Sequence, residues 1–208
     1  MSSNFQLRTF ALIDRMQPQC AAHIAATCQG DVPVAGMSEL FVEVAPGNEV
    51  FRVADVALKA ADVRPALQII EREFGLLEIH APSQAEVLAA GSAILDYLGL
   101  HETDRVRPVI ASTQLITNVH HYQAQLLNKF RKGALLLPGQ TLFVLETQPA
   151  AYVSLATNEA EKAATIDVVE IRAVGRFGRM FIAGSESEVQ TAAKAAIETL
   201  QSLEGRTS

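Results

Sequence analysis

Hydrophobic and polar residues along the chain follow an order that predicts strands and helices in alternation. Short apolar stretches at 8–13, 39–44, 63–70 and 76–81 predict strands, because each is rich in β-branched or apolar residues and bounded by turn-forming residues. Between two of them, apolar residues recur at helical spacing at Val50, Val53 and Ala57. We therefore expect helices from about 18 to 30, from about 48 to 61, and from Pro82-Ser83 onward.

The second half of the chain repeats this order. Strands are expected near 109–117, 141–146, 165–173 and 177–183, and helices near 119–132, 149–163 and 185–203. Each half contains a predicted β-hairpin, so the simplest arrangement is an antiparallel sheet with helices on one side. This is an α+β fold, ferredoxin-like or a relative of it.

Short sequence matches indicate that the two halves are copies of one unit. The matched pairs are Leu40-Phe41-Val42 with Leu142-Phe143-Val144, Lys59-Ala60-Ala61 with Lys162-Ala163-Ala164, and Phe74-Gly75 with Phe177-Gly178. Their separation is about 103 residues and drifts by one. We expect two tandem domains, residues 1–102 and 103–208, each large enough to bury its own core.

Composition and charge narrow the possible functions. The formal net charge of −6 argues against general binding of nucleic acid or of an anionic membrane surface. No apolar run approaches the roughly 18 residues of a membrane span. Cys20 and Cys28 would lie about 12 Å apart on one helix, too far to bridge. Free thiols favour a cytoplasmic protein.

The second predicted helix carries the most specific motif. Residues 54–61 read Ala-Asp-Val-Ala-Leu-Lys-Ala-Ala, and the second copy, 157–164, departs from this by having Asn158 in place of the Asp. The motif, followed by a strand that opens with Val or Ile, resembles the bacterial microcompartment shell domain. In each copy a strand and a helix precede it, an order that resembles the circularly permuted tandem shell proteins.

Nearly the whole chain resembles the carboxysome branch of these tandem proteins. The stretches that carry the resemblance are 7–9, 17–19, 43–47, 57–60, 70–72 and 158–164. The short segment before the first strand favours the β-carboxysome type. The resemblance implies a trimer that forms a pseudo-hexameric tile, and two trimers stacked face to face. It also implies contacts with other shell proteins, no cofactor and no metal.

The same resemblance implies a gated pore on the threefold axis of the tile. Its gate would be Glu71 and Arg72, within the loop Glu71-Arg72-Glu73-Phe74-Gly75, and larger metabolites such as ribulose bisphosphate and phosphoglycerate would pass. Three Arg side chains alone would repel one another, and interleaved Glu side chains can pair with them and close the opening. The alternative for this loop is a solvated hairpin turn without a function.

The equivalent loop of the second copy is Val174-Gly175-Arg176-Phe177-Gly178. Its glycines permit a tight turn at an axis, and Arg176 is the candidate for lining the pore entrance. A Gly-x-x-Gly with Arg also occurs in RNA clamps, but this one lies between two predicted strands of an acidic chain. Lys59 and Lys162 end matching helices; they either face the helix C-terminus or, as the resemblance implies, lie at the tile edge.

Other functions have weaker support in the sequence. His120 and His121 are adjacent, and on a helix their side chains point about 100° apart, which argues against a shared metal. We find no nucleophile elbow or cofactor motif, so an enzyme is disfavoured. The main alternative to a shell tile is a trimeric small-molecule sensor of the PII or ACT kind, which would require a long effector loop.

Overall fold

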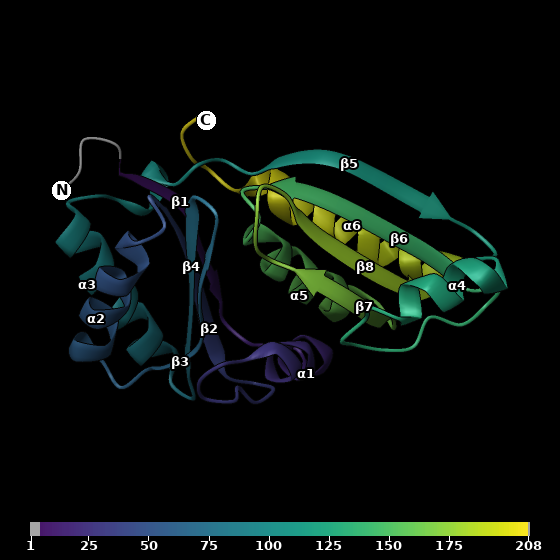
Figure 1. Cartoon of the computed structure of the whole chain (residues 1–208), viewed down its shortest axis with the longest axis horizontal. Coiled ribbons are helices and arrows are strands. Elements are labelled where there is room, and N and C mark those ends of the chain that lie inside the picture. The colour runs from purple at the N-terminus through teal and green to yellow at the C-terminus, as the bar shows by residue number, and fades with distance from the viewer. Residues whose placement is uncertain (1–4, 208) are drawn as a thin grey trace.

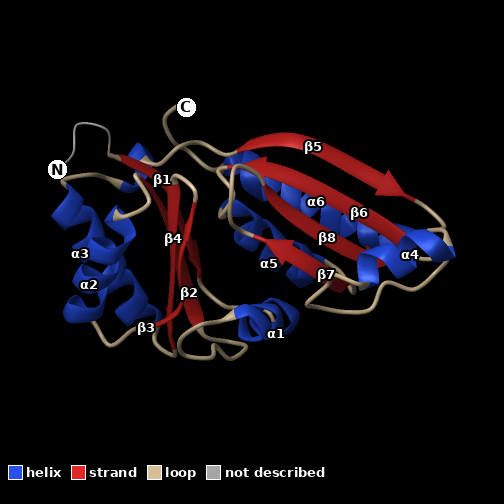
Figure 2. Ribbon diagram, viewed as in Figure 1, coloured by secondary structure: helices blue, strands red, loops and turns tan. Residues whose placement is uncertain are grey.

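The computed structural model describes residues 5–207, and these form two sheet-and-helix units joined end to end (Figures 1 and 2). Each unit contains one four-stranded antiparallel sheet. The elements of the first unit are β1 (Gln6–Ile13), α1 (Pro18–Thr27), β2 (Ser38–Ala45), α2 (Glu49–Ala60), β3 (Arg64–Glu71), β4 (Phe74–Ala81) and α3 (Gln84–Leu98). The strand order in its sheet is β1-β2-β4-β3.

The second unit has the same order of elements. They are β5 (Val109–Ile116), α4 (His121–Asn128), β6 (Thr141–Gln148), α5 (Tyr152–Ala163), β7 (Asp167–Arg172), β8 (Gly178–Gly184) and α6 (Glu186–Ser202). Its strand order, β5-β6-β8-β7, is equivalent to that of the first sheet. The predicted α+β fold with a hairpin in each copy is confirmed.

The register of the two sheets fixes which residues of the copies correspond. β1 and β5 begin at residues 6 and 109, β2 and β6 at 38 and 141, and α2 and α5 at 49 and 152, so equivalent residues are 103 apart. In agreement, Leu40 pairs with Ile79 and Phe143 pairs with Ile182. The sequence match between Leu40 and Leu142 is therefore one residue out of register.

A one-residue shift in a strand moves every side chain to the other face of the sheet. Leu40 lies in the core beneath α2 and α3, with Val53 and Ile94. Leu142 lies on the opposite face of its own sheet, in a small cluster with Val119 and Ala124 next to α4. The Leu-Phe-Val triplets are thus a chance similarity inside a genuine repeat.

The helices lie on both faces of the sheets, and the expectation of helices on one side is wrong for α1 and α4. α2 and α3 cover one face of the first sheet, and α1 lies at its other face, between the two units (Figure 1). Cys20 and Ile24 of α1 and Phe41 of β2 belong to the same buried cluster as Val153 of α5. One core therefore continues from the back of the first sheet into the second unit.

Helix α4 is shorter than expected and ends at Asn128 instead of continuing to Lys132. The side chain of Asn128 donates to the carbonyl of Leu136 at 2.8 Å and accepts from its backbone N–H at 2.9 Å. These two bonds fold the chain back into a closed loop after Asn128. Hydrogen bonds from the Asn128 side chain thus compete with the backbone hydrogen bonds of a longer helix, and the helix ends there.

The linker between the units is anchored to both of them. The buried Arg105 donates to the carbonyl of Phe10 at 2.7 Å and to that of Glu204 at 2.9 Å. Val106 donates to the carbonyl of Arg8 and accepts from the hydroxyl of Tyr152 at 2.8 Å. Burial raises the pKa of the Tyr152 hydroxyl, so it remains a donor throughout the physiological range.

Two carboxyl groups are buried together on the back face of the first sheet. Glu39 and Glu78 are both fully buried, and neither oxygen of Glu39 has a hydrogen-bond partner among the described residues. Burial, followed by the neighbouring charge of Glu78, raises the pKa of Glu39 well above its usual value. Burial and a neighbouring carboxyl both favour the neutral form of the Glu39 carboxyl.

His80 and Asp31 complete this acidic cluster. His80 Nδ1 lies 3.0 Å from Glu78, and its Nε2 lies 3.4 Å from Asp31. Burial works against protonation of His80, but the bonds to Glu78 and Asp31 outweigh it and raise its pKa. His80 thus joins the carboxyl groups of Glu78 and Asp31 at the back of the first sheet.

Replacing Glu39 by glutamine should stabilise the fold at neutral and alkaline pH. A carboxyl whose pKa is raised on folding favours the native state below its unfolded pKa of about 4.3 and loses that contribution as pH rises through the folded pKa. A glutamine amide stays neutral at every pH, so Glu39→Gln should raise Tm at pH 8 by several degrees and have little effect near pH 4. Thermal unfolding followed by circular dichroism from pH 4 to 9 measures this. Glu198→Gln, an exposed position on α6, is the control; equal pH slopes for Glu39→Gln and the parent would contradict the raised pKa of Glu39.

Candidate functional site

The predicted gate residues Glu71 and Arg72 lie at the turn between β3 and β4. Arg72 has a φ of 56°, an unusual conformation for a residue with a side chain, and directs its guanidinium into solvent with an exposed fraction of 91%. Its Nε lies 3.7 Å from the carboxylate of Glu71, which is about half exposed. The two charged groups are therefore adjacent, and most of the Arg72 side chain is in solvent.

The residue after the turn is fixed much more firmly. Phe74 lies beneath the guanidinium of Arg8, whose central carbon is 3.6 Å from the ring centroid. Arg8 is itself bonded at 2.6 Å to Glu43, and both are buried. Glu43 also accepts from the backbone N–H of Ala151 at the start of α5, at 3.1 Å. The gate turn is thus tied through Phe74 to the contact between the units.

Gly75 and Gly178, which the sequence analysis included in the two loops, allow a close approach of backbones. A Cβ on Gly75 would lie 2.3 Å from the carbonyl oxygen of Gly47, and one on Gly178 would lie 2.0 Å from that of Ala150. Both pairs are equivalent, 103 residues apart. Each glycine lets a strand pass directly against the turn that begins α2 or α5, which explains the repeated Phe-Gly.

The structure brings the two predicted loops together. Gly175 has a φ of 95°, and the atom nearest to its missing Cβ position is Cγ of Glu71, at 3.8 Å. Beside it, the guanidinium of Arg176 lies over the ring of Phe177, 5.5 Å from the centroid. The loop 174–178 therefore lies against Glu71.

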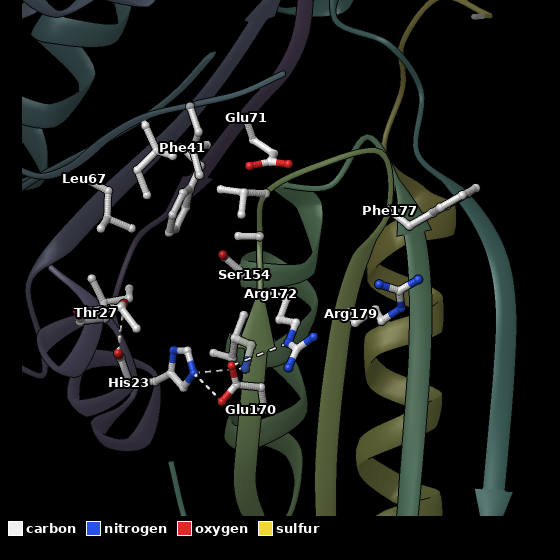
Figure 3. A pocket seen from close by; sticks show the side chains of 16 residues that line it. His23, Thr27, Phe41, Leu67, Glu71, Ser154, Glu170, Arg172, Phe177 and Arg179 are labelled. Atoms are coloured by element: carbon white, nitrogen blue, oxygen red, sulfur yellow. Dashed lines mark hydrogen bonds and ion pairs between the residues drawn. The ribbon is translucent and has the colours of Figure 1, made fainter. Parts of the chain in front are cut away.

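A cavity of about 430 Å³ lies behind these loops, between the two units. Figure 3 shows Glu71 and Phe41 from the first unit on one side and Phe177 and Arg179 from the second unit on the other. Polar groups line its lower end, where His23 Nε2 accepts from the N–H of Ile171 at 3.0 Å (Figure 3). The lining of the cavity thus combines apolar side chains with acidic and basic side chains.

Several of these lining residues were missed by the sequence analysis, including His23, Glu170 and Arg172. Glu170 accepts from the N–H of Lys132 at 2.6 Å and lies 3.6 Å from His23. Arg179 and Ser112 bind Glu146; the Ser112 hydroxyl has the larger effect, and together they lower the pKa of that carboxyl. Glu43 and Glu146 occupy equivalent positions in the two copies. This repeated Glu was the one sequence signal that could have drawn attention to the charged groups around Arg179.

Lys59 and Lys162 occupy equivalent, exposed positions near the ends of α2 and α5. Lys59 pairs with Asp55 at 2.8 Å and Lys162 with Glu159 at 3.4 Å, each on its own helix. Both ammonium groups lie in the last helical turn, where a positive charge is favourable. The structure places neither lysine in the cavity or the loops.

Other candidate chemistry remains dispersed. His120, His121 and Tyr122 are exposed and stack on one another at the start of α4, with ring centroids 4.2 Å apart between neighbours. Within residues 5–207, no group of three or more His, Cys, Asp or Glu residues is placed to hold a metal ion. Cys20 and Cys28 are free thiols. None of the helices in the described part of the chain has the length and apolar content of a membrane span.

Comparison with known proteins decides the family. Residues 7–104 match the model of the CsoS1D N-terminal domain, and residues 141–207 match that of the BMC domain. The carboxysome shell protein CcmP of Synechococcus elongatus is 47% identical over 97% of this chain and 94% of its own length. The chain belongs to the carboxysome shell proteins. The shell protein CsoS1D of Hydrogenovibrio crunogenus is similarly close, with 46% identity over 95% of this chain and 97% of its own.

Solved structures agree with this family. A fused permuted hexameric shell protein, MSM0275, superimposes with a TM-score of 0.94 at 44% identity, over 97% of this chain and all of the other. A double ringed trimeric shell protein, MSM0271, superimposes with a TM-score of 0.95 at 38% identity, over 99% of this chain and all of the other. Both belong to the RMM microcompartment. The predicted permuted tandem fold and carboxysome shell location are confirmed.

A methyl group at Gly178 should destabilise this shell protein strongly. Because the carbonyl it would meet is backbone at 2.0 Å, Gly178→Ala should cost about 1–3 kcal/mol or more. At about 2–4 °C per kcal/mol for a chain of this size, Tm should fall by several degrees. Ser92→Ala, at an exposed position of α3, should leave Tm within about 2 °C. A Gly178→Ala variant as stable as the parent would refute the close approach.

Proposed function

We propose that this shell protein forms a trimeric tile with a gated central pore for larger, phosphorylated metabolites, and that its two domains are residues 1–102 and 103–208. The observation that carries the proposal is the pairing of two loops, one from each unit. The Glu71-Arg72 turn and the 174–178 loop lie side by side, and a Cβ placed on Gly175 would lie 3.8 Å from Cγ of Glu71. A trimer would present three copies of each loop around one axis.

The charges of the Glu71 turn support a gate with two arrangements. With Arg72 turned toward Glu71, the opposite charges satisfy each other and the opening is narrow. With Arg72 turned toward the axis, three guanidinium groups form a ring suited to phosphate esters, since guanidinium binds phosphate through paired hydrogen bonds. The exposed fraction of Arg72 leaves it free to adopt both positions.

Ribulose bisphosphate and phosphoglycerate are the metabolites that a carboxysome shell has to pass, and both carry phosphate groups. The cavity behind the loops, with Arg172, Arg179 and Glu71 on its walls, opens beside this gate. The position of this cavity supports movement of the Glu71 loop, because side chains of the loop that are displaced would have space to occupy. Two trimers stacked face to face would enclose a chamber between two such gates.

A PII-like or ACT-like sensor has less support. Such a protein requires a long effector loop, whereas the turns from β3 to β4 and from β7 to β8 span residues 72–73 and 173–177. An enzyme also has less support, because the described loops and cavity hold no nucleophilic side chain in contact with a base. The shell tile therefore remains the function that the geometry supports best.

Substituting the gate residues should change ligand binding and pore shape in opposite ways. Arg72→Ala removes the positive ring and should weaken binding of ribulose bisphosphate about tenfold or more, the value of a lost charge-assisted hydrogen bond. Glu71→Ala leaves Arg72 unpaired and should favour the open pore. Calorimetry with ribulose bisphosphate and with phosphoglycerate, and a crystal structure of each variant, measure these effects.

The control is Arg64→Ala, an exposed arginine at the start of β3, the end of the strand far from the gate turn. It removes the same charge and should leave affinity within about twofold of the parent. The gate assignment fails if Arg64→Ala and Arg72→Ala weaken binding equally, or if neither gate variant alters the pore.

Lys59→Ala and Lys162→Ala should leave the trimer intact and weaken the assembly of tiles into sheets. Both lysines are exposed and outside the loops and the contact between the units. Negative-stain electron microscopy compares the sheets, and light scattering checks the trimer. Lys194→Ala, on the exposed side of α6, should assemble as the parent does. If both variants form the same sheets as the parent, the assignment of these lysines to the tile edge is wrong.

A further inference from the structure

The two copies of the unit bury different kinds of side chain on the back faces of their sheets. Three titratable residues are almost fully buried in the first copy: Glu39, Glu78 and His80. Their equivalents, 103 residues later, are three buried apolar residues: Leu142, Phe181 and Ala183. These three belong to one apolar cluster. The fold therefore does not require titratable groups at these positions, and we expect them to have a role other than packing in the first copy.

The two clusters lie in otherwise equivalent surroundings. Glu39 lies opposite His80 in the register of the first sheet, and their equivalents lie opposite each other in the second. After burial and the charge of Glu161, the charge of Glu39 is a further cause of the raised pKa of the Cys20 thiol, so the Glu39 carboxyl lies near α1. In the second copy, Ala124 of α4 belongs to the apolar cluster. Each cluster therefore lies beneath the helix that precedes the second strand of its sheet.

The loop that follows each of these helices is bonded to the neighbouring strand in the same way. In the first copy, the N–H of Gly30 donates to the carbonyl of Ala66 at 3.1 Å, and that of Asp31 donates to the carbonyl of Pro65 at 2.9 Å. The same two bonds recur 103 residues later: Gly133 to Val169 at 3.0 Å and Ala134 to Val168 at 2.8 Å. We call α1 with the loop 28–37 the first cover, and α4 with the loop 129–140 the second cover.

The groups that face Glu39 leave its carboxyl unpaired. Neither of its oxygens has a hydrogen-bond partner among the described residues. The groups that face it are Glu78 and His80 from β4 and the Cys20 thiol from α1. His80, the basic group among them, is bonded to Glu78 and Asp31 instead. An ionised Glu39 would therefore be buried without a partner, which is costly.

Two groups of this cluster lose protons in the same direction of pH. Burial, followed by the charge of Glu78, raises the pKa of Glu39. For His80, burial opposes protonation, but the bonds to Glu78 and Asp31 outweigh it and raise its pKa. Asp31 is also paired with the exposed Arg64, at 3.4 Å. Each raised group stabilises the closed cover fully below its unfolded pKa, about 4.3 or 6.5, and loses that contribution as pH rises through its folded pKa.

We propose that Glu39 and His80 form a pH switch beneath the first cover, which is closed while both carry their protons and opens when they lose them. Opening admits water to the carboxylate of Glu39, which then no longer has to be buried without a partner. The second cover lies on an apolar cluster and stays closed at every pH. Buried polar groups that lower stability can serve as switches of this kind.

Opening of the first cover alters the cavity between the units. Helix α1 contributes three residues to the wall of that cavity: His23, Ile24 and Thr27. The first turn of α1 is held to α5 across the junction between the units, because Glu161 accepts from the N–H groups of Gln19 and Cys20. The larger movement is therefore in the last turn of α1 and in the loop 28–37. The switch does not depend on the proposed pore or gate, because all of its contacts lie within one chain.

Hydrogen exchange of the full-length protein tests the switch. Peptides that cover 18–37 and 121–140 report on the two covers in the same molecule, and mass spectrometry from pH 5 to pH 9 follows both after correction for the intrinsic exchange rate. Protection of 18–37 should fall by about tenfold or more, since one linked proton changes an opening equilibrium by up to about tenfold per pH unit. Protection of 121–140 should stay within about twofold, because the cluster beneath it is apolar.

Two variants separate the switch from a general effect of pH. Glu39→Gln stays neutral, so the protection of 18–37 at pH 8 should be about tenfold higher than in the parent. Glu39→Leu combined with His80→Ala gives the first copy the residues of the second, and the protection of 18–37 should then no longer depend on pH. Glu198→Gln, exposed on α6, is the control and should keep the pH dependence of the parent.

The inference is overturned if 18–37 keeps its protection up to pH 9, if both covers lose protection in parallel, or if Glu39→Gln matches the parent at pH 8. If the double variant does not fold, Glu39→Gln, which keeps the shape of the side chain, decides the outcome on its own. None of these results bears on the gate, because ligand binding at Glu71 and Arg72 is not measured.

Discussion

The capping of α1 by α5 is the interaction on which the arrangement of the chain depends. The first N–H groups of a helix have no partner inside that helix, and for α1 two of them bond to Glu161 of the other unit. Asn158, fully buried, takes the N–H of Gln17 just before the helix. Because these hydrogen bonds are partly buried, moving α1 away from α5 would break them and leave the buried Asn158 amide without its partner, which is costly. The back face of the first sheet, the cavity and the position of the Gly175 loop all follow from this contact.

The repeat made most of the fold predictable from the sequence. Helix α2 and its counterpart were recognised because their apolar residues have helical spacing and their Lys-Ala-Ala endings match. The exact register could not be obtained in this way, since the Leu-Phe-Val triplets favoured an alignment one residue off. The position of α1 on the opposite face was also not predictable, because its partners, Glu161 and Asn158, lie more than 140 residues away in the sequence.

The loops of the candidate site were found from the sequence, but their surroundings were not. Glu71 and Arg72 are consecutive, so the resemblance identified them directly. The neighbours that form the cavity, such as His23 and Glu170, come from different units and share no local pattern. Asn158 illustrates the difference. It was read as a departure from the motif at Asp55, and in the structure it is the residue whose amide both accepts from Gln17 and donates to the carbonyl of Arg15.

The anchored linker has a consequence for the order in which contacts form. Arg105 and Val106 hold β1 beside the start of the second unit, so the two halves of the junction experience a high effective concentration of each other. A tethered contact does not depend on protein concentration, and it can rely on directional hydrogen bonds that add little net stability. The chain can therefore complete its internal junction at any dilution, for example just after synthesis, before it meets another copy.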